Sequence, residues 1–80
     1  MELNELVRLK EQIKPKIEKG DFVVVGKMLG ISQENARMRF ARNKEQEILA
    51  MKALVENRER LIEEYQKQIV KDFGIVEEVI

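Results

Sequence analysis

The sequence predicts an all-α fold in which three short helices precede one long C-terminal helix. Apolar residues recur at three- and four-residue steps along most of the 80-residue chain, which is the spacing of amphipathic helices. Glycine and serine stand between the periodic segments, and these residue types end and begin helices. The run Phe22–Val25 has strand propensity, but the chain offers it no partner strand. We therefore expect helices alone.

The composition leaves little equipment for catalysis. The chain has no cysteine and no histidine, which excludes disulfides, zinc–thiolate sites and the usual general base. The neighbours Glu63–Glu64 and Glu77–Glu78 are not converging carboxylate pairs, because adjacent side chains on a helix point roughly 100° apart. No glycine-rich phosphate loop is present. We expect no enzymatic activity, no cofactor, no metal ion and no small-molecule ligand.

The sequence also indicates where in the cell the protein is located. No apolar run approaches the roughly 20 residues that span a bilayer. The start Met1–Leu3 is acidic and does not resemble a signal peptide. We expect a cytoplasmic protein without membrane contact, with one domain and a modest core.

The first helix is predicted from an apolar series that begins at Leu3. Pro15 lies inside this series and cannot donate a hydrogen bond to the carbonyl of Glu11, so a kink or break is expected near Gln12–Lys14. The apolar series of this segment consists of Leu3, Leu6, Val7, Leu9, Ile13 and Ile17.

The second and third helices are predicted from their caps. Gly20 is expected to end the first segment, and Asp21 to cap a helix over Phe22–Leu29. Gly30 fits the left-handed residue that ends that helix. Ser32 is expected to cap the third helix by accepting a hydrogen bond from the N–H of Glu34 or Asn35.

The third helix has two different faces. Ala36 and Phe40 lie four residues apart and are expected to face inward together with Ile31. Asn43 and Lys44 mark the turn before the long helix. The outward side of the third helix is expected to carry Gln33, Glu34, Arg37, Met38 and Ala41.

The charge is unevenly distributed, although the net charge of the chain is zero. Residues 20–44 carry five basic and two acidic side chains, a net charge of +3. Residues 1–19 carry +1, residues 45–71 carry −1 and residues 72–80 carry −3. A basic patch is the electrostatic footprint of nucleic-acid binding, and here it falls on the second and third helices.

These residues resemble the helix-turn-helix motif of bacterial and phage DNA-binding regulators, over about Phe22 to Phe40. In that motif the small residue, here Gly26, lies where two helices cross, and a larger side chain would push them apart. The family usually has alanine there and a branched residue at the place of Ala36. An ordinary helical hairpin with a glycine turn is the alternative interpretation. The places of the motif are held by Val25, Gly26, Lys27, Met28, Leu29, Gly30, Ile31, Ser32 and Gln33.

The resemblance implies that the third helix lies in the major groove of double-stranded DNA. Gln33 suits adenine and Arg37 suits guanine, while Glu34 either accepts from cytosine or favours the helix dipole. Arg39 points partly sideways and is better explained as a solvated surface charge. The candidate base contacts are Gln33, Glu34, Arg37 and Met38. The candidate phosphate contacts are Lys27, Ser32, Arg39, Arg42, Asn43 and Lys44.

The long helix, expected over about Glu45–Asp72, carries an apolar seam at heptad steps, with Arg58 in one of its places. About 27 residues extend roughly 40 Å, which exceeds a core of this size, so part of the helix should protrude and meet a second chain. Intramolecular packing on the first segment is the alternative. A second stripe, Leu49, Ala53, Leu54 and Leu61, is expected to cover the DNA-binding helices. The candidate dimer seam is Ile48, Met51, Val55, Ile62, Tyr65 and Ile69.

The sequence therefore predicts two parts. Residues 1–44 form an N-terminal amphipathic helix plus a helix-turn-helix over 22–41, and residues 45–80 form a long helix and an apolar tail for self-association. The expected function is sequence-specific binding of double-stranded DNA by a small homodimeric transcriptional regulator. The alternative is a structural or assembly protein, similar to small packaging subunits of phages, that uses the fold for protein contacts.

Overall fold

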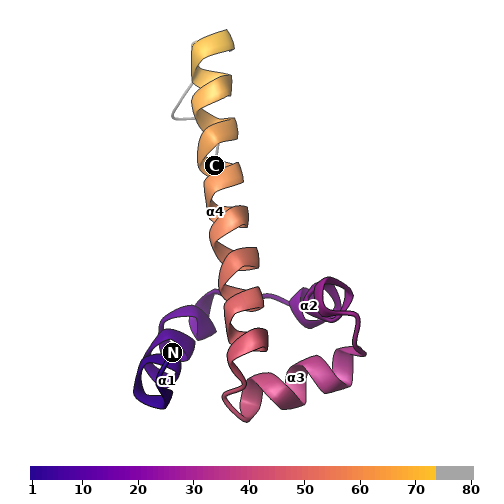
Figure 1. The fold of residues 1–80 in the computed structure, drawn as a ribbon. Coiled ribbons are helices and arrows are strands. Elements are labelled where there is room, and N and C mark those ends of the chain that lie inside the picture. The colour runs from indigo at the N-terminus through magenta and orange to yellow at the C-terminus, as the bar shows by residue number, and fades with distance from the viewer. Residues whose placement is uncertain (74–80) are drawn as a thin grey trace.

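The structure is all-helical over the residues that it describes, which are 1–73 of the computed structural model. The elements in order are α1 (Leu3–Ile13), the 3-10 helix η1 (Lys14–Lys16), α2 (Asp21–Leu29), α3 (Gln33–Ala41) and α4 (Glu45–Phe73). Figure 1 shows α1, α2 and α3 gathered around the first half of α4, whose second half projects away from them. We call α1 to α3 with α4 up to Arg58 the head. The predicted all-α class with one long C-terminal helix is confirmed.

Pro15 sets the end of α1. The α-helix ends at Ile13, and Lys14–Lys16 continue it as a single 3-10 turn with the proline near its start. Pro15 has no N–H for the carbonyl of Glu11, so the α-helical ladder cannot continue. The break expected near Gln12–Lys14 is confirmed.

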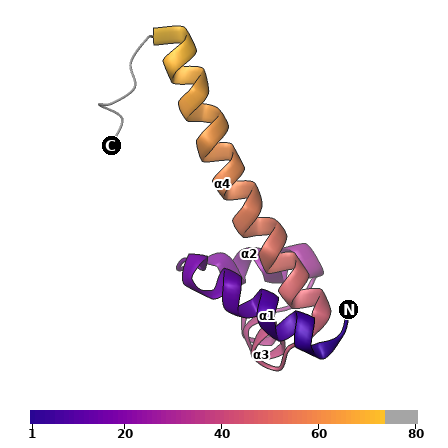
Figure 2. The ribbon, with the colours of Figure 1, turned by 90° about the vertical axis from the view of Figure 1, so that its left-hand side faces the viewer.

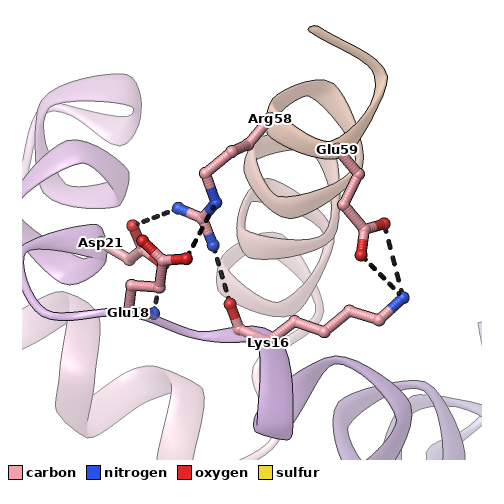
Figure 3. A network of polar contacts seen from close by, with 5 residues as sticks. All are labelled: Lys16, Glu18, Asp21, Arg58 and Glu59. Carbon is pink, nitrogen blue, oxygen red and sulfur yellow. Dashed lines mark hydrogen bonds and ion pairs between the residues drawn. The ribbon is translucent and has the colours of Figure 1, made fainter. Parts of the chain in front are cut away.

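The start of α2 differs from the prediction. Gly20 occupies the N-cap position in the left-handed region, at φ +91°, and Asp21 is the first helical residue. The Asp21 carboxylate turns backward instead of capping its own helix. It accepts a hydrogen bond from the Glu18 N–H (2.6 Å) and one from the Arg58 guanidinium (2.8 Å). Figure 3 shows how these contacts tie the loop before α2 to α4.

The turn between α2 and α3 has the predicted chemistry. Gly30 ends α2 in the left-handed region, at φ +71°, where glycine meets no Cβ penalty. The Ser32 hydroxyl accepts a hydrogen bond from the Asn35 N–H (3.1 Å) and so satisfies one free donor at the start of α3. Ile31 lies half-buried against the core between the two helices.

Replacing Ser32 by alanine should lower the free energy of unfolding by about 1 kcal/mol, because the Asn35 N–H loses its partner. For a domain of this size, that corresponds to a fall in melting temperature of about 4–8 °C. Thermal unfolding followed by circular dichroism measures it. Ser32→Asp should retain the cap and melt close to wild type. If Ser32→Asp lowers the melting temperature as much as Ser32→Ala does, the stability lost in Ser32→Ala does not come from the capping hydrogen bond.

The core takes one stripe from each helix. Ala36 and Phe40 face inward as predicted, with 0% and 5% of their surface exposed. Phe40 packs edge-on against the Phe22 ring at 5.4 Å between centroids. The buried apolar set is Leu6, Ile13, Val25, Ala36, Phe40, Ile48, Ala50, Met51 and Val55.

The two stripes of α4 are used differently from the expectation. The predicted seam between chains includes Ile48, Met51 and Val55, but these side chains are fully buried against the chain's own α1–α3. That half of the dimer prediction is wrong, because a partner cannot reach side chains that the head already encloses. In the second stripe, Leu54 packs against the core as expected, whereas Leu49, Ala53 and Leu61 are exposed.

The burial pattern also revises the division of the chain. The boundary expected after residue 44 runs through a single core, because α4 up to Val55 completes it. Beyond Arg58, more than half of the surface of Ile62 and Tyr65 is exposed, while Ile69 is half-buried. These three residues remain open to a role in self-association. The apolar tail assigned to self-association, residues 74–80, lies outside the described residues.

Candidate nucleic-acid interface

The outward face of α3 lies at one end of the molecule. Figure 1 shows α3 at the end opposite to the projecting part of α4. Since Ala36 and Phe40 hold the inner face, Glu34 and Met38 point away from the head, and both are exposed. Gln33 is exposed in the first turn. This face is free to enter a groove without moving any core side chain.

Arg37 does not project straight outward. Its guanidinium lies over the ring of Phe22, in the first turn of α2, 5.4 Å from the centroid. An exposed cation–π contact contributes about 0.5–1 kcal/mol, so the side chain can swing toward a base at small cost. The interaction holds Arg37 at the edge of the face that Glu34 and Met38 form.

Gly26 is required by the turn and not by a crossing of helix backbones. A Cβ built on Gly26 would lie 2.7 Å from the Ile31 carbonyl oxygen and 3.4 Å from backbone atoms of Ser32. The turn folds closely over this residue, because the Ile31 N–H donates to the Gly26 carbonyl at 2.8 Å. The expected close approach is present, but its partner is the turn backbone.

Exposed cations come before and after α3 in the chain. Lys27 on α2 is exposed, and so are Arg42 and Lys44 in the turn that follows α3. Arg42 and Lys44 line a polar pocket together with Arg39 and the first turn of α4. Lys27 precedes α3 and Arg42 and Lys44 follow it, so a duplex in contact with α3 would meet positive charge from both neighbouring segments.

Arg39 has a partner inside the protein. Its guanidinium lies 3.6 Å from the carboxylate of Glu47, whose side chain is 2% exposed. The same Glu47 oxygen has no hydrogen-bond partner within the described residues. Moving Arg39 to a phosphate would leave this buried carboxylate without its counter-charge. We therefore assign Arg39 to holding Glu47, in place of the phosphate contact expected for it.

Asn43 also has a structural role in place of the expected phosphate contact. It adopts the left-handed conformation at φ +61°, which asparagine tolerates better than most residues. Its side-chain oxygen accepts a hydrogen bond from the Lys10 ammonium (3.0 Å), which also donates to the Ala41 carbonyl (3.1 Å). Lys10 thus caps the C-terminal end of α3 from α1. Sequence reasoning missed Lys10, since nothing local links it to residues 31 or more positions away.

The described residues show neither a metal site nor a membrane span. No group of three or more acidic, histidine or cysteine side chains within residues 1–73 is placed to hold a metal ion. No helix in the same range is both long and apolar enough to cross a membrane. Comparison with known proteins adds no relative, because no family model, curated protein or solved structure matches the chain.

Proposed function

We propose that the protein is a cytoplasmic regulator that binds double-stranded DNA, with α3 lying in the major groove. The observation that carries this proposal is the outward face of α3, where Glu34 and Met38 are exposed, together with exposed cations on α2 (Lys27) and in the turn after α3 (Arg42 and Lys44). In a helix-turn-helix the second helix reads base edges with its N-terminal residues. Here α2, a three-residue turn and α3 supply such a pair of helices.

Two arginines have separate roles in this proposal. Arg37 swings off the Phe22 ring and donates two hydrogen bonds to a guanine. Arg42, exposed directly after α3, meets the phosphate backbone. Gln33, Glu34 and Met38 lie on the same face and contact neighbouring base pairs, while Lys27 and Lys44 add sequence-independent attraction.

Replacing Arg37 by alanine should weaken binding to the preferred site by about 1–3 kcal/mol and relax discrimination at one base pair. Replacing Arg42 by alanine should weaken binding to all duplexes alike and lower the salt slope by about one per bound site. Fluorescence anisotropy at several salt concentrations, on a selected site and on random duplex, measures both. Circular dichroism checks that each variant is folded.

Arg60→Ala is the matched control, because Arg60 is a cation on α4 that donates to Asn57 (2.7 Å) and lies outside the proposed interface. It should leave both the affinity and the salt slope unchanged. Arg37→Lys retains the charge without the bidentate geometry, so it should lose affinity only on the preferred site. A folded wild-type protein that binds no duplex at low salt would refute DNA binding and favour an assembly protein.

A further inference from the structure

The second half of α4 presents an apolar stripe outside the head. Figure 2 shows this half projecting well beyond the other helices, along the longest dimension of the molecule, 46 Å. The stripe continues the heptad steps of Ile48, Met51 and Val55 past Arg58. It consists of Leu61, Ile62, Tyr65 and Ile69, of which the first three are more than half exposed. We call these four residues the distal stripe.

We propose that the distal stripe binds the distal stripe of a second copy in antiparallel orientation, and that the resulting dimer bridges two DNA segments. The bridging rests on the proposed DNA binding, whereas the antiparallel pairing rests on α4 alone. An antiparallel dimer of this kind would join two duplexes, or two distant sites of one duplex, and would not occupy adjacent half-sites.

The charges along α4 favour a second copy in this orientation. Residues 61–66 carry a net charge of −2, and residues 68–73, which include Lys71 and Asp72, a net charge of zero. Antiparallel pairing sets each acidic half beside the neutral half of its partner, and parallel pairing sets the two acidic halves together. Because these side chains are exposed and about one Debye length apart, they influence orientation more than affinity. Gln66 and Gln68 flank the stripe itself, so its edges are uncharged.

The head excludes parallel pairing. Val55 and Arg58 lie on the same face of α4 as the distal stripe, and this face is occupied by the chain's own head. Arg58 contacts both Asp21 and the Lys16 carbonyl there, and Ile62 lines a shallow pocket beside them. A parallel partner helix would have to run through this occupied space. An antiparallel partner helix ends before it reaches this space, so it does not clash with the head.

The head also sets the register of the two helices, because a partner helix cannot extend past Arg58. When Tyr65 faces Ile69 of the second copy, the two helices overlap over residues 61–73 and each helix ends where the other head begins. This overlap is about 20 Å long. Few side chains take part, so the buried area falls in the class of weak interfaces below about 1,200 Å². We expect a dimer with a dissociation constant in the micromolar range.

The antiparallel dimer places its recognition faces far apart. The two-fold axis passes near residue 67, and Glu45 lies 22 residues from it, or about 33 Å at 1.5 Å per residue. The two α3 helices are therefore about 65 Å apart, at opposite ends, with their outward faces directed away from each other. Half-sites on one side of a duplex lie about 34 Å apart or a multiple of this distance, and recognition faces directed away from each other cannot contact the same side.

Disulfide crosslinking tests the orientation. The chain has no cysteine, so Tyr65→Cys and Ile69→Cys chains of different mass each carry a single thiol. Mixed in a glutathione redox buffer, they should form at least five times more mixed disulfide than either homodisulfide. In the antiparallel register two copies of residue 65 are offset by about 6 Å along the axis, too far for a disulfide between helices. A predominance of homodisulfides would establish parallel pairing and overturn the proposal.

A two-duplex assay tests the bridging with the full chain. One duplex is held on beads and a second carries a fluorophore; wild type above its dimer dissociation constant should retain the second duplex. Tyr65→Glu should raise that constant at least tenfold and abolish retention, with single-duplex affinity unchanged. Arg8→Gln is the matched control, because it lowers the net charge equally from an exposed position on α1, outside the stripe. It should retain bridging.

The outcomes separate the two proposals. A wild type that binds one duplex but retains no second one overturns the bridging and leaves DNA binding intact. A wild type that binds no duplex removes the bridging, while the disulfide pattern still decides the antiparallel pairing. A full-length monomer that dimerises only after Val76→Asp and Val79→Asp are introduced would show that residues 74–80 occupy the stripe, which also overturns the proposal.

Discussion

Gly26→Leu should destabilise the protein by more than about 3 kcal/mol, a large part of the roughly 5–10 kcal/mol that holds a small domain folded. Even a single Cβ at this position would lie 2.7 Å from the Ile31 carbonyl oxygen. That oxygen belongs to the backbone of a turn whose own N–H is bonded to Gly26, so it cannot move without opening the turn. Gly26→Ala should already cost about 1–3 kcal/mol.

The sign of the alanine effect is the informative result. In an unconstrained helix, replacing glycine by alanine stabilises by about 1 kcal/mol. Lys27→Ala and Lys27→Leu are the matched controls, since Lys27 is the exposed neighbour in the same helix. They should melt near wild type in urea or heat. A Gly26→Ala protein as stable as wild type would mean that the turn does not approach this residue closely.

Local signals in the sequence are sufficient for the helices and for most of their joints, the start of α2 excepted, where Asp21 pairs with Arg58. Pro15 removes a backbone donor, Gly30 accepts a positive φ, and Ser32 supplies a cap, and each of these effects acts within a few residues. The bounds of α2 and α3 could therefore be predicted to within a residue. The exposed side of α3 followed from Ala36 and Phe40 alone.

Tertiary packing determines which face of α4 is turned toward the head, so the periodicity of its apolar residues could not predict that face. The helix carries two apolar stripes, one through Ile48 and one through Leu49, and either could cover the head. Core packing selected the first, which left only its distal part for a partner. Arg58 was a usable signal, because a charge in an apolar stripe needs an acidic partner when buried. That partner is Asp21, with Glu18 close by, and the sequence alone does not single them out among its 15 acidic residues.

The candidate interface likewise depends on long-range contacts that the sequence does not reveal. Gln33, Glu34, Arg37 and Met38 are exposed where the helix-turn-helix pattern places them. Asn43, by contrast, serves the fold through a contact with Lys10, on another helix. Such long-range pairs leave no periodic trace in one sequence, so the predicted phosphate contacts included residues that the fold itself uses.

Arg58→Met should destabilise the protein by about 3 kcal/mol. The guanidinium donates to the Asp21 carboxylate (2.8 Å) and the Lys16 carbonyl (2.7 Å), as Figure 3 shows. Asp21 is only 5% exposed, so losing Arg58 leaves a buried carboxylate without its counter-charge. Breaking a buried pair typically costs about 3–5 kcal/mol, and the partial exposure of Arg58 places this pair at the low end. Chemical denaturation at pH 7 measures the loss.

The pH dependence identifies the cause. Burial raises the pKa of Asp21, but hydrogen bonds from Arg58 and the Glu18 N–H, with the charge of Arg58, lower it below its usual range overall. The stability from this ion pair is therefore fully present above about pH 4, the unfolded pKa of aspartate, and is lost as the pH falls through the lower folded pKa. The difference in the free energy of unfolding between wild type and Arg58→Met should therefore become smaller as the pH falls.

Two further variants separate a buried ion pair from ordinary packing. Asp21→Asn combined with Arg58→Met should recover part of the loss, because no charge is then left buried. Glu59→Gln breaks the adjacent Lys16–Glu59 pair (3.2 Å), which joins the same loop to the same helix but is half exposed. It should change the free energy of unfolding by less than about 1 kcal/mol. If Glu59→Gln destabilises as much as Arg58→Met, the loop is held by its surface charges in general and the Arg58–Asp21 pair has no special role.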